Sequence, residues 1–165
     1  IPIVGLEPSC VATVREEYLD LLDDPRAERL AGGILLLEEL LVREGANLEG
    51  VFRDREERVW IHGHCHQKAL TGIAPAVAAL RLVPGLDVQV VDAGCCGMAG
   101  AFGYEHYDLS MAVGEERLFP ALRALPEGAV IVAEGISCRQ QIAHGTGRRA
   151  RHLAEVLRDS LAPAP

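Results

Sequence analysis

Residues 88–100 read VQVVDAGCCGMAG, a buried-strand pattern followed directly by a loop with two adjacent cysteines. The valine-rich run is typical of a central strand in a sheet. Glycines let the loop turn tightly, and we expect them to bring backbone N–H groups close to a bound cofactor. They are Gly94, Gly97 and Gly100. The stretch therefore predicts a strand whose carboxyl end presents Cys95 and Cys96 to a ligand.

Further short strand patterns alternate with helical patterns along the chain. Strands are predicted at 1–6, 58–61, 88–91 and 129–132. Helices are predicted at 25–42, 75–82, 106–125, 139–144 and 151–161, with a break near Pro120 in the third. This order predicts an α/β fold with a mostly parallel four-stranded sheet and helices on both faces.

The five cysteines follow the four predicted strands. Ligands in such sheets bind beyond the carboxyl ends of the strands, so all five thiols are expected at one edge of the sheet. An odd number of cysteines without a secretory signal argues against a disulfide framework and for reduced thiols that serve a metal or a redox reaction. The candidate ligands are Cys10, Cys65, Cys95, Cys96 and Cys138.

The segment HGHCHQ at 62–67 adds three imidazole side chains beside Cys65. Thiolates are soft donors that select zinc or iron–sulfur clusters, and imidazole suits zinc or iron. His62, His64 and His66 are therefore candidate metal ligands or proton carriers. The alternative for each histidine is a structural role in the core.

Composition and charge exclude several classes of partner. Sixteen basic residues against 24 acidic residues give a net charge of −8, which argues against nucleic-acid or anionic membrane surfaces. No apolar run approaches the roughly 20 residues of a membrane span, and no signal peptide is visible. We expect a cytoplasmic protein. The chain begins at Ile1, and we expect it to be a fragment of a larger protein.

An internal repeat is visible in two short segments. VGLEPSC at 4–10 resembles VAEGISC at 132–138, and each is a strand pattern followed by a turn and Ser-Cys at the start of a helix. The chain is therefore expected to hold the end of one repeat, at 1–50, and a complete second repeat, at 51–165.

GHCHQKA at 63–69, GCCGMAGAFG at 94–103 and EGISCRQQI at 134–142 together resemble the CCG cysteine-rich domain. That domain occurs in heterodisulfide reductase, in iron–sulfur subunits of glycolate oxidase and anaerobic glycerol-3-phosphate dehydrogenase, and in lactate-utilisation proteins. The segments 5–10, 106–115 and 145–157 look most like large fusion proteins with an FAD-linked oxidase domain, a ferredoxin-type module and two CCG repeats.

The resemblance implies a metal centre, either a non-cubane [4Fe–4S] cluster or zinc, held by the cysteines of the second repeat. Cys10 matches the last cysteine of the first repeat. Heterodisulfide reductase has a further cysteine three positions earlier, and this chain has Gly135 there, and Glu7 in the first repeat. Four thiolates, or three with a histidine, suit zinc or a simpler cluster. Cys10 is an alternative fifth donor if its strand joins the same sheet.

The resemblance also implies a function. The chain would be the electron-transfer domain of a flavin-dependent 2-hydroxy-acid dehydrogenase, passing electrons from the flavin domain through ferredoxin-like centres to a quinone or another acceptor. FAD would lie in the rest of the protein, and this fragment alone would not turn over a substrate. Association with the inner membrane would be peripheral, through partners.

Two alternatives remain at this point. A closed thiolate site could hold a structural zinc that stabilises the fold and docks the redox partner without carrying electrons. A metal-free pair of thiols could instead carry out thiol–disulfide exchange.

Overall fold

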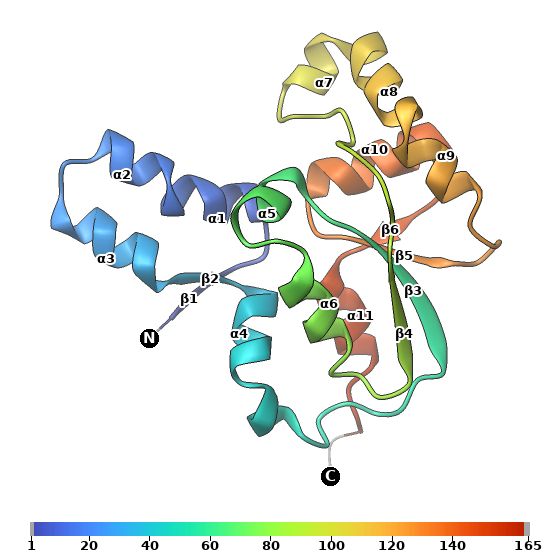
Figure 1. Ribbon diagram of the computed structural model, residues 1–165, viewed down its shortest axis with the longest axis horizontal. Coiled ribbons are helices and arrows are strands. Elements are labelled where there is room, and N and C mark those ends of the chain that lie inside the picture. Colours follow the sequence, from blue (N-terminus) through green and yellow to red (C-terminus); the bar gives the residue numbers. More distant parts are fainter. Residues whose placement is uncertain (1, 164–165) are drawn as a thin grey trace.

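The computed structural model describes residues 2–163, which form a four-stranded sheet surrounded by helices (Figure 1). Its strand order is β4-β3-β5-β6, and all three pairings are parallel. The strands are β3 (Glu57–His62), β4 (Leu86–Val90), β5 (Val130–Ala133) and β6 (Ala150–Arg151). The predicted α/β class and parallel four-stranded sheet are confirmed.

Helices cover both faces of this sheet, as predicted, because successive side chains of each strand point to opposite faces. Val59, Ile61 and Val132 pack with α6 and α11, whereas Ile131 and Ala133 pack with α9 and α10. The helices of this part of the chain are α5 (Cys65–Leu70), α6 (Ala74–Leu80), α7 (Phe102–Glu105), α8 (Tyr107–Glu116), α9 (Leu118–Arg123), α10 (Ile136–Thr146) and α11 (Leu153–Asp159).

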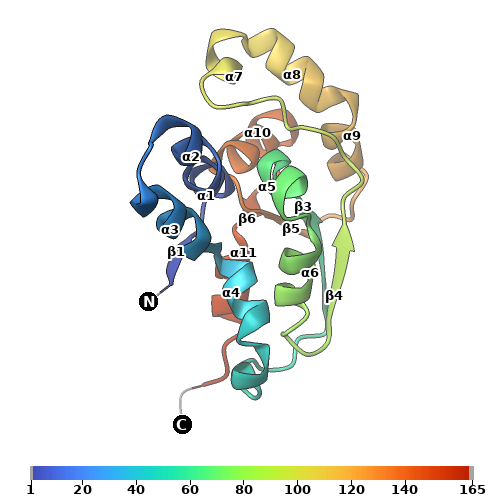
Figure 2. The same ribbon diagram turned by 60° about the vertical axis from the view of Figure 1, so that its left-hand side comes forward.

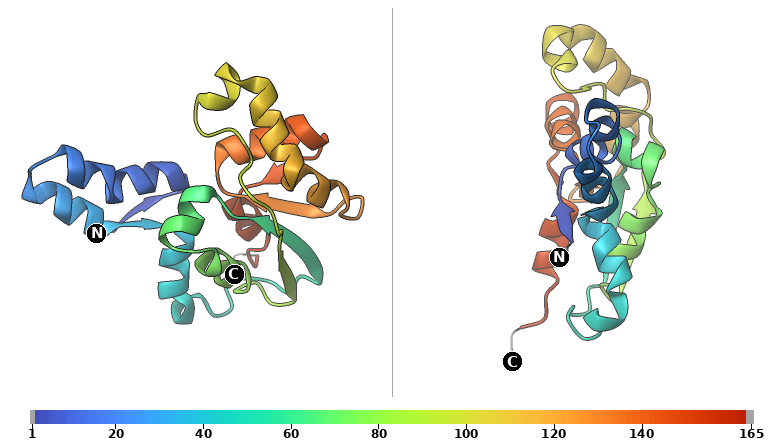
Figure 3. Two further views of the ribbon diagram at one scale, coloured as in Figure 1. Left: turned by 45° about the horizontal axis from the view of Figure 1, so that its top comes forward. Right: turned by 90° about the vertical axis from the view of Figure 1, so that its left-hand side faces the viewer.

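The N-terminal part forms a separate two-stranded parallel sheet with its own helices. Its elements are β1 (Ile3–Gly5), α1 (Pro8–Arg15), α2 (Glu17–Leu21), α3 (Pro25–Gly33), β2 (Ile34–Leu36), α4 (Leu37–Arg43) and the 3-10 helix η1 (Gly45–Leu48). Figure 3 shows α1, α2 and α3 extending away from the main sheet.

Three predictions about the elements were wrong. The first predicted strand does not join the main sheet, because β1 pairs with β2; the fourth strand of the main sheet is β6 instead. The single helix predicted at 25–42 is divided by β2, since the adjacent glycines Gly32 and Gly33, poor helix formers, close α3. The helix at 106–125 breaks at Arg117 rather than at Pro120, which lies in the first turn of α9 and needs no donor there.

The order of elements repeats in the two sheets. The unit β1–α1, β2–α4 matches β5–α10, β6–α11, and the strand pair is parallel in both. The last helix of each unit begins with the same cap: Glu39 accepts from the backbone N–H of Leu36, and Glu155 accepts from that of His152, both at 2.7 Å. In the main sheet, β3 pairs with the other edge of β5.

Candidate metal centre

A cleft of about 600 Å³ opens at the carboxyl edge of the main sheet. Helices α5 and α10 begin side by side there, and the loop after β4 runs past them (Figure 2). Sequence reasoning placed the candidate ligands at this edge because each follows a strand. Those that line the cleft are His64, Cys65, His66, Cys95, Cys96 and Cys138.

Cys10 does not share this position. It is exposed on α1 and does not line the cleft, although its neighbours Glu7 and Ser9 do. The expectation that all five thiols lie at one edge of a single sheet was therefore wrong for Cys10. The physical reason is the strand pairing, because β1 belongs to the two-stranded sheet. Its loop brings Glu7 and Ser9 to the cleft, whereas Cys10 is exposed on α1.

The four remaining thiols interact in a row, and their acidities alternate. Hydrogen bonds from Cys65 and then Cys96 lower the pKa of Cys95 to about 2, and the backbone N–H of Gly97, 3.3 Å from Sγ, adds to this effect. The hydrogen bond from Cys96 lowers the pKa of Cys138 to about 5. The same contacts raise the pKa of Cys65 and of Cys96. The contacts along the row therefore favour ionisation of Cys95 and Cys138 and disfavour ionisation of Cys65 and Cys96.

The three histidines occupy different positions. His62, the last residue of β3, is fully buried, and its contact with Cys138 lowers the pKa of that thiol. Neither ring nitrogen makes a hydrogen bond of ordinary geometry. His64 is the N-cap of α5, and its Nδ1 accepts from the backbone N–H of His66 at 3.2 Å. His66 is exposed, with its ring edge-on to that of His64 at 5.3 Å.

His64 fills the space beside Gly135, the position at which the family resemblance predicts a further cysteine. A Cβ atom on Gly135 would lie 2.3 Å from Cδ2 and 3.1 Å from Nε2 of His64, and 3.4 Å from Sγ of Cys138. The imidazole therefore packs against the backbone where a longer side chain at Gly135 would have to pass. Glu7 also approaches this helix start, since its Oε2 accepts from the backbone N–H of Ile136 at 2.9 Å.

The three glycines expected to bind a cofactor differ in their constraints. Gly97 has φ +96°, and a Cβ there would lie 2.2 Å from the carbonyl oxygen of Ser110. Gly100 has φ +66° with open space around it, and a Cβ on Gly94 would meet nothing within 4 Å. Close packing against α8 thus requires glycine at position 97. Among the three glycines, Gly97 is also the one whose backbone N–H donates to a sulfur atom, that of Cys95.

The donors were tested for their fit to a metal. The sulfur-rich donor set and the unpartnered imidazole of His62 suit a soft metal centre by their chemistry. However, residues 2–163 contain no group of three or more His, Cys, Asp or Glu side chains arranged to hold one metal ion.

Sequence reasoning missed a buried polar network next to the cleft. The amide Nε2 of Gln67 donates to Oε1 of Glu38 at 2.7 Å and to Glu134. All three side chains are buried, and burial, followed by the charge of Glu38, raises the pKa of Glu134 to about 9. The sequence signal was an acidic residue directly after the strand pattern at 129–132, at the same edge as the cysteines.

Lys68 is a second functional candidate that the sequence did not reveal. Its Nζ donates to the carbonyl oxygen of Ala93 at 2.9 Å. The hydrogen bond with Cys95 and burial raise the pKa of Cys65, and the positive charge of Lys68 acts in the opposite direction. The ammonium therefore lies near the row of thiols and connects α5 to the loop of Cys95.

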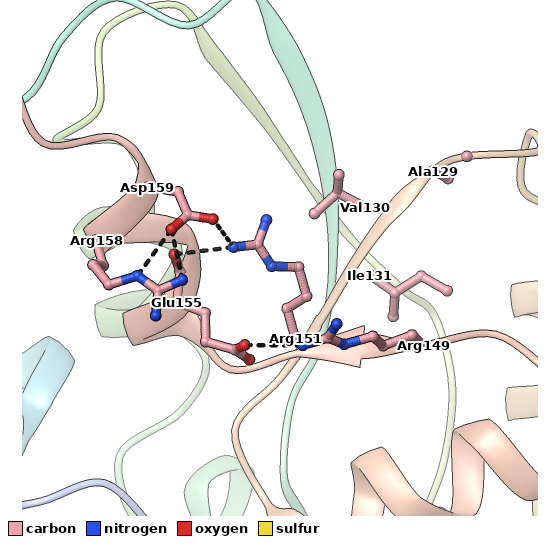
Figure 4. Close-up of a pocket in the computed structure, with 9 residues that line it drawn as sticks. Ala129, Val130, Ile131, Arg149, Arg151, Glu155, Arg158 and Asp159 are labelled. Carbon is pink, nitrogen blue, oxygen red and sulfur yellow. Dashed lines mark hydrogen bonds and ion pairs between the residues drawn. The ribbon is translucent and has the colours of Figure 1, made fainter.

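A second hollow, of about 420 Å³, lies at the opposite ends of β5 and β6 (Figure 4). Its arginines are paired within the chain: Arg151 and Arg158 with Asp159, and Arg149 with Glu155. These three arginines thus form ion pairs with acidic residues of α11.

None of the protein-family models matches this chain. The chain is similar to three proteins of larger size. D-2-hydroxyglutarate dehydrogenase of Escherichia coli (strain K12) is 32% identical over 160 residues, which are 95% of this chain and 15% of that protein. A component of anaerobic glycerol-3-phosphate dehydrogenase from the same organism is 30% identical over 98% of this chain and 41% of its own length.

Lactate utilization protein A of Exiguobacterium sp. (strain ATCC BAA-1283 / AT1b) is 29% identical over 98% of this chain and 70% of its own length. The chain thus spans less than half of the first two relatives. Two of these relatives carry the names of a dehydrogenase or of a dehydrogenase subunit. No helix among residues 2–163 is long and apolar enough to cross a membrane.

Proposed function

We propose that this chain is a CCG-type electron-transfer domain that binds an iron–sulfur cluster in the cleft at the carboxyl edge of its main sheet. The observation that carries the proposal is the gathering of Cys65, Cys95, Cys96 and Cys138, from three different strand ends, in one cleft. Such a convergence of thiols is typical of a site for a soft metal centre.

The cluster, when bound, would supply one-electron chemistry. The chain itself would supply thiolate donors, and the contacts that lower the pKa of Cys95 and Cys138 favour the thiolate form of these two. The N–H of Gly97 and the ammonium of Lys68 would stabilise negative charge on the thiols. Burial of Cys96 and Cys138 would keep water from part of the centre, which tunes its reduction potential.

The wider setting is part of the same proposal. The full protein would contain an FAD domain that oxidises a 2-hydroxy acid, a ferredoxin-like module, and this domain, which passes electrons to a quinone or another acceptor. The names of the relatives support this class of reaction. The protein would be cytoplasmic, with peripheral association at the inner membrane through its partners.

The proposal extends to the domain organisation. Residues 1–50 would end a first CCG repeat, and 51–165 would form the second. The repeated order of elements and the matching caps of α4 and α11 support this division. Cys10, at the start of α1, would then serve a centre in the first repeat.

A structural zinc is the second candidate, and the glycine at position 135 in place of a cysteine is the observation that favours it. Four thiolates would satisfy one zinc ion.

Metal and acid-labile sulfide analysis of the anaerobically purified protein tests the proposal. We expect iron and sulfide in about equal amounts. Both should be lost in Cys95→Ser and retained in the matched variant Cys10→Ser, whose thiol is exposed and outside the cleft. Zinc without sulfide would support the second candidate. A metal-free protein in which Cys95 alkylates rapidly would favour thiol–disulfide exchange.

A further inference from the structure

His62 is the residue whose surroundings the fold alone leaves unexplained. Its side chain is fully buried at the end of β3, and both Nδ1 and Nε2 lack a hydrogen-bond partner. Among residues 2–163, the two ring nitrogens of His62 are the only buried side-chain nitrogen or oxygen atoms that lack a hydrogen-bond partner. Because leaving a buried polar group unpaired costs free energy, such a group in a native protein calls for a partner, and a bound ion or ligand in the adjacent cleft would supply one.

The neighbours of His62 show where that ligand would lie. The ring is beside Cys138, and it is close enough to lower the pKa of both Cys138 and Cys95. Both cysteines line the cleft, Cys95 from the loop after β4 and Cys138 from the first turn of α10. His62 does not itself line the cleft, so it faces the thiolates from the interior side.

His64 is a poorer donor for a metal, although it lies nearer the cleft. Its Nδ1 lone pair accepts the N–H of His66 as the cap of α5. In the neutral ring the proton is then on Nε2. Binding a metal through Nε2 would therefore require loss of that proton.

His66 is exposed at the mouth of the cleft, and its position requires no metal. His62 is thus fully excluded from water, its ring nitrogens make no hydrogen bond of ordinary geometry, and its contact is with the thiol of Cys138. A neutral imidazole whose lone pair no other group uses is the form in which histidine binds a metal.

We propose that His62 is a ligand of the metal centre, binding through a ring nitrogen as the donor that adds to the four thiols of the cleft. This inference rests on the proposed function, since it assigns a ligand to the cluster proposed there. A mixed set of thiolates and one buried imidazole would raise the reduction potential above that of a centre with thiolates alone.

The test uses the full chain loaded with iron and sulfide without oxygen, with histidine nitrogen isotopically labelled. Pulsed electron paramagnetic resonance of the paramagnetic redox state should show strong coupling to a histidine nitrogen. The coupling should disappear in His62→Asn and in His62→Cys, and His62→Cys should retain iron because a thiol replaces the imidazole. His62→Asn should bind iron about tenfold or more weakly.

His64→Asn is the matched control, because asparagine also caps a helix N-terminus and the variant loses only Nε2 and the ring. It should retain the coupling.

A cluster without histidine coupling in the wild type, or coupling that survives in His62→Cys and is lost in His64→Asn, would overturn the assignment while leaving the proposed function intact. A wild-type protein without iron and sulfide would overturn both. If His62→Asn does not fold, the wild type and His62→Cys still decide.

Discussion

Lys68 donates from Nζ to the carbonyl oxygen of Ala93 at 2.9 Å and so connects helix α5 to the loop that carries Cys95 and Cys96. Replacing Lys68 by methionine keeps most of the apolar stem and removes the donor. We expect amide hydrogen exchange in 91–101 to accelerate about fivefold to tenfold, since a charged hydrogen bond contributes on the order of 1 kcal/mol or more. Lys68→Arg, which keeps a donor, should exchange more slowly than Lys68→Met. Identical exchange in all three proteins would show that the contact does not hold the loop.

The glycines of the loop should respond differently to alanine. Gly97→Ala should lower the free energy of unfolding by about 3 kcal/mol, because it combines a positive φ with a Cβ 2.2 Å from the Ser110 carbonyl oxygen. Gly100→Ala, which has only the positive φ, should cost about 1 kcal/mol. Gly94→Ala, with open space, should cost less than about 0.5 kcal/mol. Urea unfolding measures all three, and an equal loss in Gly94→Ala and Gly97→Ala would contradict this ranking.

Contact between Gly135 and His64 should appear as a non-additive pair. Gly135→Ala should destabilise the protein by about 2 kcal/mol, because its Cβ would lie 2.3 Å from Cδ2 of His64. His64→Ser removes the ring and keeps a side-chain cap for α5. In that background, Gly135→Ala should cost at least about 1 kcal/mol less. Additive losses in a double-mutant cycle would mean that the ring does not fill this space.

Glu134 should make the stability of the protein depend on pH. Burial beside Glu38 raises its pKa from 4.5 to about 9, so the folded protein keeps a proton that the unfolded chain loses between these values. The stabilisation is complete below about pH 4.5 and is lost as the pH rises through about 9. Glu134→Gln removes the titration and keeps an acceptor for Gln67.

Urea unfolding of both proteins between pH 5 and 9 measures this difference. The wild type should lose on the order of a few kcal/mol relative to Glu134→Gln over this range. Parallel pH profiles for the two proteins would show that Glu134 is ionised in the folded state.

The sequence was sufficient to predict β3, β4 and β5, because each is a short β-branched run followed by a turn. Since parallel strands end at the same edge, it also predicted that Cys65, Cys95, Cys96 and Cys138 meet. It was insufficient for β2 and β6, which have three and two residues and no periodicity that can be recognised. The pairing of β1 with β2 bridges more than 20 residues of helix, so local pattern could not reveal it.

The side-chain environment of the site was also beyond the sequence. The pattern HGHCHQ makes its three histidines equivalent, but the helix that begins at Cys65 uses His64 as its cap and leaves His62 in the core. Glu134 and Glu38 are far apart in the sequence, and only tertiary packing places both against Gln67.

The most direct test of the central claim is a stepwise reductive titration of the anaerobically purified protein, followed by visible absorption and electron paramagnetic resonance. We expect a coloured protein that takes up about one electron per cluster. An oxidant should restore the starting spectrum, and Cys95→Ser should take up no electrons. A colourless protein that accepts no electrons, with or without bound zinc, would contradict an electron-transfer role for this domain.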